Sequence, residues 1–241
     1  MKALTNPPTI EDYRELLVNH VKRLEEQRNC AINSSTKVSI VTVVYNAEAT
    51  IERTLKSIAC QNYENIEYII IDAKSSDRTL EIIEKYKHIV TYLISEKDGG
   101  IYDAMNKGIS LCSGELIGLL NADDFYEPDA LHNLISYYTT HKGDVLHGNV
   151  NYVKNGEKLF TLKPPIHLSK ASFTEMPINH PATFIKREVY EEIGLYRTNY
   201  KIAADWELTL RAFMQYKNFI YLPFTITNYS LEGVSSINAS L

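Results

Sequence analysis

Acidic and small polar side chains recur directly after short apolar runs of this sequence. Asp72 closes the run IEYIIID, and the string Asn121-Ala122-Asp123-Asp124 follows the run ELIGLL. Carboxylates in such positions suit Mg²⁺ or Mn²⁺, which bind through one or two protein carboxylates and complete their shells with water and substrate phosphates. The position of these acids therefore favours a divalent-metal site for a phosphorylated ligand at residues 121–124.

These acids also have a structural explanation. Ser76 or Asp77 could cap the helix that follows them, and Asp123 could cap a helix beginning near residue 129. Capping does not explain why Asp72 and Asp123 lie at the tips of apolar strands. Several acids crowded on one edge repel each other unless a cation or ligand donors lie among them.

The elements that must position these residues alternate in type along the first half of the chain. Apolar, β-branched runs predict buried strands, and helical periodicity appears between them. The strands are expected at 38–45, 66–72, 90–94 and 116–120, and the helices at 48–61, 77–87 and 102–111. This order predicts an α/β fold, a doubly wound and mostly parallel sheet with right-handed crossovers. Ligands bind at the carboxyl ends of such strands, where the acids lie.

Beyond Pro128, strands and helices no longer alternate regularly along the sequence. Asn155-Gly156 is a turn signal that predicts a hairpin, and Pro164-Pro165 marks a loop. The remaining elements are expected as helices at 129–140, 187–193 and 204–216 and strands at 145–150 and 219–222.

The length of 241 residues suits one α/β domain with an extension. We divide the chain into an amphipathic helical extension at 1–36, a ligand-binding half at 37–150 and a second half of the same domain at 151–241. Residues 10–29 carry an apolar stripe at helical spacing. This stripe could pack on the domain, pair with a second copy as a homodimer, or lie on a membrane surface.

Composition excludes several classes of protein. The net charge of −5 argues against a nucleic-acid partner, and no GxGxxG motif follows a strand, which argues against a dinucleotide-binding dehydrogenase. The three cysteines lack metal-ligand spacing. Neither a signal peptide nor a membrane-spanning run is recognisable, so we expect a cytoplasmic protein.

Three long motifs resemble those of family 2 glycosyltransferases with the GT-A fold. They are VSIVTVVYNAEATIERTLKSIACQNYENIEYIIIDAKSSDRT, SEKDGGIYDAMNKGISLCSGELIGLLNADD and NHPATFIKREVYEEIGLYRTNYKIAADWELTLR. The resemblance covers about residues 38–213 and points to bacterial enzymes that build O-antigen, capsule or exopolysaccharide. It implies that 37–150 binds the nucleotide sugar and that 151–241 binds the acceptor and carries the catalytic base.

The resemblance assigns roles to individual residues. Asn121 occupies the first acidic position of the family's metal-binding DxD motif and Asp123 the second, while Asp124 is a second contact. The residues implied to line the donor nucleotide are Tyr45, Glu48, Asp72 and Ser75 around the nucleoside, and Asp98, Gly99 and Asn106 around the ribose and diphosphate. Backbone amides at 98–100 could donate to the phosphates.

Asp205 in AADWEL matches the family's catalytic carboxylate, which implies a general base that takes the proton of the acceptor hydroxyl. A plain helix cap is the alternative for this residue. His180 in INHPATF could contact the diphosphate, the metal or the acceptor, or could be a structural histidine.

Together these features predict a metal-dependent, inverting glycosyltransferase that uses Mn²⁺ or Mg²⁺. The expected donor is a UDP-linked hexose or N-acetylhexosamine, and the expected acceptor is a lipid-linked saccharide at the inner membrane face. A sugar-nucleotide pyrophosphorylase is an alternative, but it needs a glycine-rich loop where this chain reads YNAEATIERTL. Ala73, Ala204 and Asn121 replace family acids, which leaves a non-catalytic sugar-binding module as a further alternative.

Overall fold

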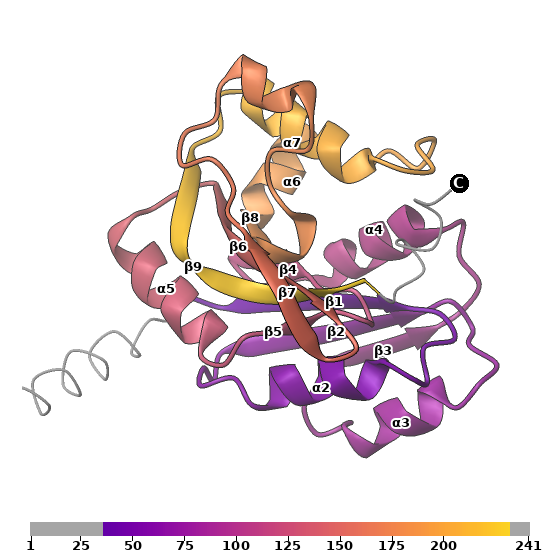
Figure 1. Cartoon of the computed structure of the whole chain (residues 1–241). Helices are drawn as coiled ribbons and strands as arrows, with labels where there is room; N and C mark the ends of the chain where they lie inside the picture. The colour runs from indigo at the N-terminus through magenta and orange to yellow at the C-terminus, as the bar shows by residue number, and fades with distance from the viewer. Residues whose placement is uncertain (1–35, 232–241) are drawn as a thin grey trace, which may run out of the picture. The chain divides into compact units, whose positions relative to one another are not determined.

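The computed structural model describes residues 36–231, and the helix expected at 10–29 lies outside this range. In the first half, strands and helices alternate as expected (Figure 1). The elements are β1 (Val38–Val44), α2 (Ile51–Ala59), β2 (Ile66–Asp72), α3 (Thr79–Lys85), β3 (Tyr92–Ser95), α4 (Ile101–Leu111) and β4 (Leu116–Leu119). All seven residues of β1 are buried, which agrees with a sequence that is mostly apolar and β-branched rather than alternating.

Beyond β4, the chain contains two strands that sequence periodicity did not predict. They are β5 (Phe125–Tyr126) and β8 (Thr183–Lys186), both too short to show a period. The other elements are α5 (Ala130–Thr140), β6 (Val145–Lys154), β7 (Glu157–Leu162), the 3₁₀ helices η1 (Lys170–Thr174) and η2 (His180–Ala182), α6 (Arg187–Ile193), α7 (Ala204–Met214) and β9 (Phe219–Ser230). The last strand thus extends eight residues beyond the expected end at 222. The predicted hairpin turn is confirmed, since Asn155 and Gly156 both have positive φ.

The strands form one mixed sheet in the order β3-β2-β1-β4-β8-β6-β9-β5, with β7 also paired to β6. The strands β3, β2, β1 and β4 run parallel, and β8 enters antiparallel between β4 and β6. Gly118 permits this insertion, because a Cβ atom at that position would lie 2.5 Å from the Phe184 ring of β8.

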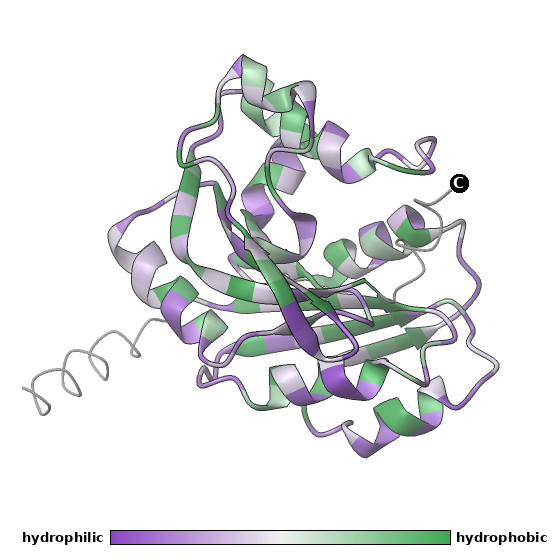
Figure 2. Cartoon of the chain, in the orientation of Figure 1, coloured by the Kyte–Doolittle hydropathy of each residue, from purple (hydrophilic) through white to green (hydrophobic). Residues whose placement is uncertain are grey.

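Helices cover both faces of the sheet (Figure 1). One core packs α2, α3 and α5 against strand residues such as Ile40 and Tyr68. The opposite core packs α4, α6 and α7 against residues such as Val41 and Ile69. The hydrophobic colour follows the central strands in Figure 2. Within residues 36–231, no helix has both the length and the apolar character that a membrane span requires.

Candidate active site

The loops after β1 and β2 are tied to each other at the carboxyl edge of the sheet. The amide of Asn46 donates to the Ser75 hydroxyl at 2.8 Å. The amide of Glu48 donates to Asp77 at 3.0 Å, and the amide of Arg78 donates to the Glu48 carboxylate at 2.9 Å. These bonds fix the expected nucleoside pocket before any ligand binds.

Asp72 is the central anchor of this pocket. Its side chain is fully buried and accepts bonds from the Ser75 amide at 3.0 Å and from the Ser75 and Ser95 hydroxyls at 2.5 Å each. Tyr45, by contrast, is 61% exposed, and Glu48 is also exposed. Tyr45 and Glu48 are therefore the expected pocket residues that face solvent, while Asp72 holds the turn that carries Ser75.

The loop Asp98-Gly99-Gly100 leads into α4 with its own amides already bonded. The Gly100 amide donates to Asp98 at 2.9 Å, and the Gly99 amide donates to Asp103 at 2.9 Å. Gly100 has φ +119°, a conformation that favours glycine. These two amides are bonded within the loop in the absence of a ligand, and the expected donation from residues 98–100 to phosphates stays a prediction.

Asn106, one turn beyond Tyr102 on α4, forms a two-way amide pair with the Tyr196 backbone. Its Nδ2 donates to the Tyr196 carbonyl at 2.8 Å, and its Oδ1 accepts from the Tyr196 amide at 3.0 Å. The structure thus places Asn106 against the segment that precedes α7, and its expected contact with the donor stays a prediction.

The two acids after β4 have different environments. Asp124 is fully buried and accepts from the Ser230 amide at 3.0 Å and from Asn121 Nδ2 at 3.2 Å. Asp123 is partly exposed, and Arg53 donates to its backbone carbonyl at 2.9 Å. Among the described residues, no other residue donates to the Asp123 carboxylate, so this group remains available to a ligand.

Electrostatics at this loop are consistent with a cation. Burial raises the pKa of Asp123, and burial together with the Asp123 charge raises the pKa of Asp124. The Oδ1 atom of Asn121 is buried without a hydrogen-bond partner. Asp123 and Asn121 therefore offer two free oxygen ligands, which fits Mg²⁺ or Mn²⁺ completed by phosphates. No group of three or more potential metal-binding side chains exists within residues 36–231.

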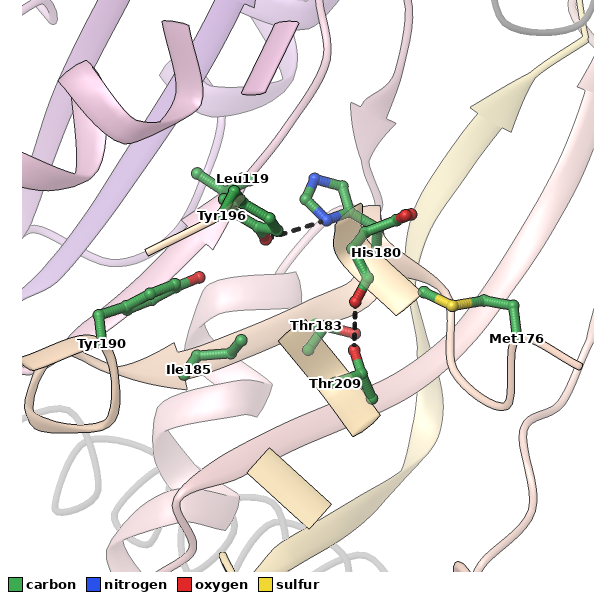
Figure 3. A pocket seen from close by; sticks show the side chains of 9 residues that line it. Leu119, Met176, His180, Thr183, Ile185, Tyr190, Tyr196 and Thr209 are labelled. Atoms are coloured by element: carbon green, nitrogen blue, oxygen red, sulfur yellow. Dashed lines mark hydrogen bonds between the residues drawn. The ribbon is translucent and has the colours of Figure 1, made fainter. Parts of the chain in front are cut away.

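Asp205 lies at the start of α7 but does not cap it. The cap residue is Ala203, and no side chain caps the helix, so the capping explanation is wrong. The Tyr102 hydroxyl donates to Asp205 Oδ1 at 3.3 Å. Asp205 lines a small cavity of about 10 Å³. Figure 3 shows His180, Tyr196 and Thr209, which line the same cavity.

His180 begins η2 and extends into the same cavity. Its Nδ1 lies 3.4 Å from the Tyr196 hydroxyl, and its Nε2 is buried without a partner. Burial lowers the His180 pKa, although the Asp205 charge opposes this effect. The imidazole is therefore neutral at pH 7, and its buried Nε2 has no hydrogen-bond partner.

The structure brings the candidate residues together in three groups. Asp205 and His180 share a cavity, Asn121 and Asp124 share a hydrogen bond, and Ser75 bonds Asp72. Tyr102 and Tyr196 were missed by sequence reasoning. Tyr102 stands one helical turn before Asn106, and this spacing was the one signal that could have linked it to the site.

Comparisons with known proteins agree with this geometry. A model described as Glycosyl transferase family 2 matches residues 39–194. A PGL/p-HBAD biosynthesis glycosyltransferase of Mycobacterium bovis is 30% identical over 83% of this chain and 76% of its own length.

Two solved structures are similar in fold. TarS of S. aureus in complex with UDP-GlcNAc has a TM-score of 0.68 at 21% identity over 80% of this chain. The mannosyltransferase PcManGT of Pyrobaculum calidifontis, in complex with GDP-Man and Mn²⁺, has a TM-score of 0.61 at 19% identity over 82% of this chain. The chain spans 58% of the length of each of these two proteins.

Both neighbours have the GT-A fold, and the mixed α/β sheet described above corresponds to it. With the family model matching 156 residues and the acids collected at the expected strand ends, the chain belongs to glycosyl transferase family 2.

Proposed function

We propose that this protein is a metal-dependent, inverting transferase that moves a hexose or N-acetylhexosamine from a UDP-sugar to a saccharide acceptor. The observation that carries the proposal is the Asp205 carboxylate, which lines a cavity and does not serve as a helix cap. The nucleotide sugars bound by the two structural neighbours support a donor of this class.

Asp123 and Asn121 would hold Mn²⁺ or Mg²⁺. When bound, the metal would neutralise the charge that develops on the departing diphosphate. Tyr45 and Glu48 would contact the nucleoside, and Asp72 would keep the Ser75 turn in place. The absence of other donors at the Asp123 carboxylate supports this assignment.

The chemical step would be a single displacement. The acceptor oxygen forms a bond to the anomeric carbon while the bond from that carbon to the diphosphate breaks. Asp205 takes the hydroxyl proton through the oxygen that Tyr102 does not hold. Attack from the face opposite the leaving group inverts the anomeric centre.

We also propose that the acceptor is lipid-linked and that the protein works at the inner membrane face as part of surface polysaccharide synthesis. The amphipathic stripe at 10–29 would assist docking or dimerisation. Deleting residues 1–36 should then weaken vesicle binding or reduce the oligomeric mass, and no change in either quantity would contradict this role.

The test of the proposed reaction is Asp205→Asn. The amide keeps the shape of the side chain but cannot accept the proton, so turnover should fall roughly 10²–10⁴-fold. Calorimetry with UDP-sugar and Mn²⁺ should show an unchanged donor dissociation constant. Normal turnover would reject Asp205 as the base, and retention of the anomeric configuration by the wild type would reject the single displacement.

A further inference from the structure

Helix α4 connects the donor-side loop to the proposed base. It begins at Ile101, directly after Asp98-Gly99-Gly100, and presents Tyr102 and Asn106 one turn apart. Tyr102 donates to Asp205 Oδ1, and its ring stacks on Tyr196 with 5.5 Å between the ring centroids. Asn106 fixes the backbone of the same Tyr196.

Tyr102 donates a side-chain hydrogen bond to Asp205, and two other titratable side chains, His180 and Tyr196, line the same cavity as Asp205. His180, from η2, is neutral at pH 7 because burial lowers its pKa. Tyr196 stays protonated because burial raises its pKa, and its hydroxyl lies beside His180. Burial and the Asp205 charge raise the pKa of Tyr102 to about 12, so its hydroxyl keeps its proton at neutral pH.

We infer that Tyr102 is a positioning residue for Asp205: its hydroxyl holds Oδ1 and directs Oδ2 toward the acceptor hydroxyl. This inference rests on the proposed role of Asp205 as the base. A hydrogen bond to the ionised form of a carboxyl favours that form, so its loss in a variant should show in the pH dependence of turnover.

The test is Tyr102→Phe, which preserves the ring and its stacking on Tyr196. We expect kcat to fall on the order of tenfold, as for loss of one hydrogen bond to a charged group. The acid limb of the kcat–pH profile should move to higher pH, and the donor dissociation constant should stay unchanged. A purely structural role for Tyr102 would not move the acid limb.

Tyr138→Phe is the matched control. Tyr138 also donates to a carboxylate, Glu115 Oε1 at 2.5 Å, but it lies on α5 outside the site. This control should keep the wild-type pH profile. An unchanged profile in Tyr102→Phe, or the same shift in Tyr138→Phe, would overturn the inference.

Tyr102→Gln is a second test variant, because the glutamine amide can donate a hydrogen bond although the aromatic ring is absent. Turnover above that of Tyr102→Phe supports positioning by hydrogen bonding, whereas turnover equal to or below it contradicts that explanation. Full activity of Asp205→Asn would contradict the proposed function and, with it, the role inferred for Tyr102. If Asp205→Asn is inactive while Tyr102→Phe matches the wild type, only the present inference fails.

Discussion

Two acids at opposite ends of the parallel strands, the buried Glu67 and the partly exposed Asp123, have contrasting surroundings. Glu67, near the start of β2, accepts from Lys37 at 3.0 Å, from the Ser39 hydroxyl at 2.5 Å and from both the amide and hydroxyl of Ser113 at 2.7 Å. Asp123, just after β4, accepts nothing at its carboxylate from other described residues. The fold supplies four donors to the Glu67 carboxylate and, among the described residues, none from another residue to the Asp123 carboxylate.

The pKa values of the two acids are shifted in opposite directions. Burial alone would raise the Glu67 pKa, but the bonds from Ser113, Ser39 and Lys37 lower it to about 2. Burial also raises the Asp123 pKa, and the residue's own backbone amide and the Arg53 charge oppose this rise without reversing it. Burial alone therefore does not set the direction of an acid's pKa shift, because the donors around the carboxylate can reverse it.

The largest expected effect is on catalysis by Asp123→Ala. Loss of the metal-binding carboxylate should reduce transfer roughly 10³-fold or more, since metal stabilisation of a leaving phosphate contributes several kcal/mol. The melting temperature should change little, because no described residue depends on this carboxylate. Full wild-type activity of the protein in EDTA would contradict the metal assignment.

Glu67→Gln should instead reduce the free energy of unfolding and leave the transfer activity unchanged. The folded pKa lies below the unfolded value of 4.5, so the ionised acid stabilises the fold by about 3 kcal/mol above pH 4.5. This contribution is lost as pH falls from 4.5 toward 2. Urea unfolding at several pH values measures it, and a variant as stable as the wild type at pH 7 would show that the four donors contribute nothing.

Sequence alone could not separate these two acids. Both stand in or after apolar runs, and the donors to Glu67 come from Lys37, Ser39 and Ser113, up to 46 positions away. The parallel strands and the acids at their tips were predictable, because local periodicity specifies buried strands and topology specifies their carboxyl edge.

The missed features depend on tertiary contacts. The four-residue strand β8 is recognisable only through its pairing with β4 and β6. The bond between Asp124 and Ser230 spans 106 positions, and that between Tyr102 and Asp205 spans 103. No local pattern encodes such pairs, so the positioning contacts of the site needed the structure.

The buried histidine His147 shows how burial without hydrogen-bond partners shifts the pKa of a basic side chain. It lies in β6, fully buried, with both ring nitrogens unpartnered, and burial lowers its pKa to about 4. The unfolded chain binds more protons below pH 6.5, so stability should fall by about 2 kcal/mol between pH 6.5 and 5. His147→Leu should remove this dependence in thermal melts, and an unchanged pH profile would contradict the explanation.

Asn121→Asp should have the smallest effect. It replaces the donor to Asp124 with a second charge, so the metal-free protein should melt a few degrees lower. Mn²⁺ should raise the melting temperature more than in the wild type, because the site gains a carboxylate. Asn121→Ala is the control, and an equal Mn²⁺ response in both variants would exclude residue 121 as a ligand.

The most direct test of the contrast between the two acids is calorimetric binding of UDP with and without Mn²⁺. The account predicts that Mn²⁺ tightens UDP binding in the wild type and in Glu67→Gln, and that Asp123→Ala loses this dependence. Equal Mn²⁺ dependence in Asp123→Ala and the wild type would contradict the claim that the unpartnered acid after β4 binds the metal.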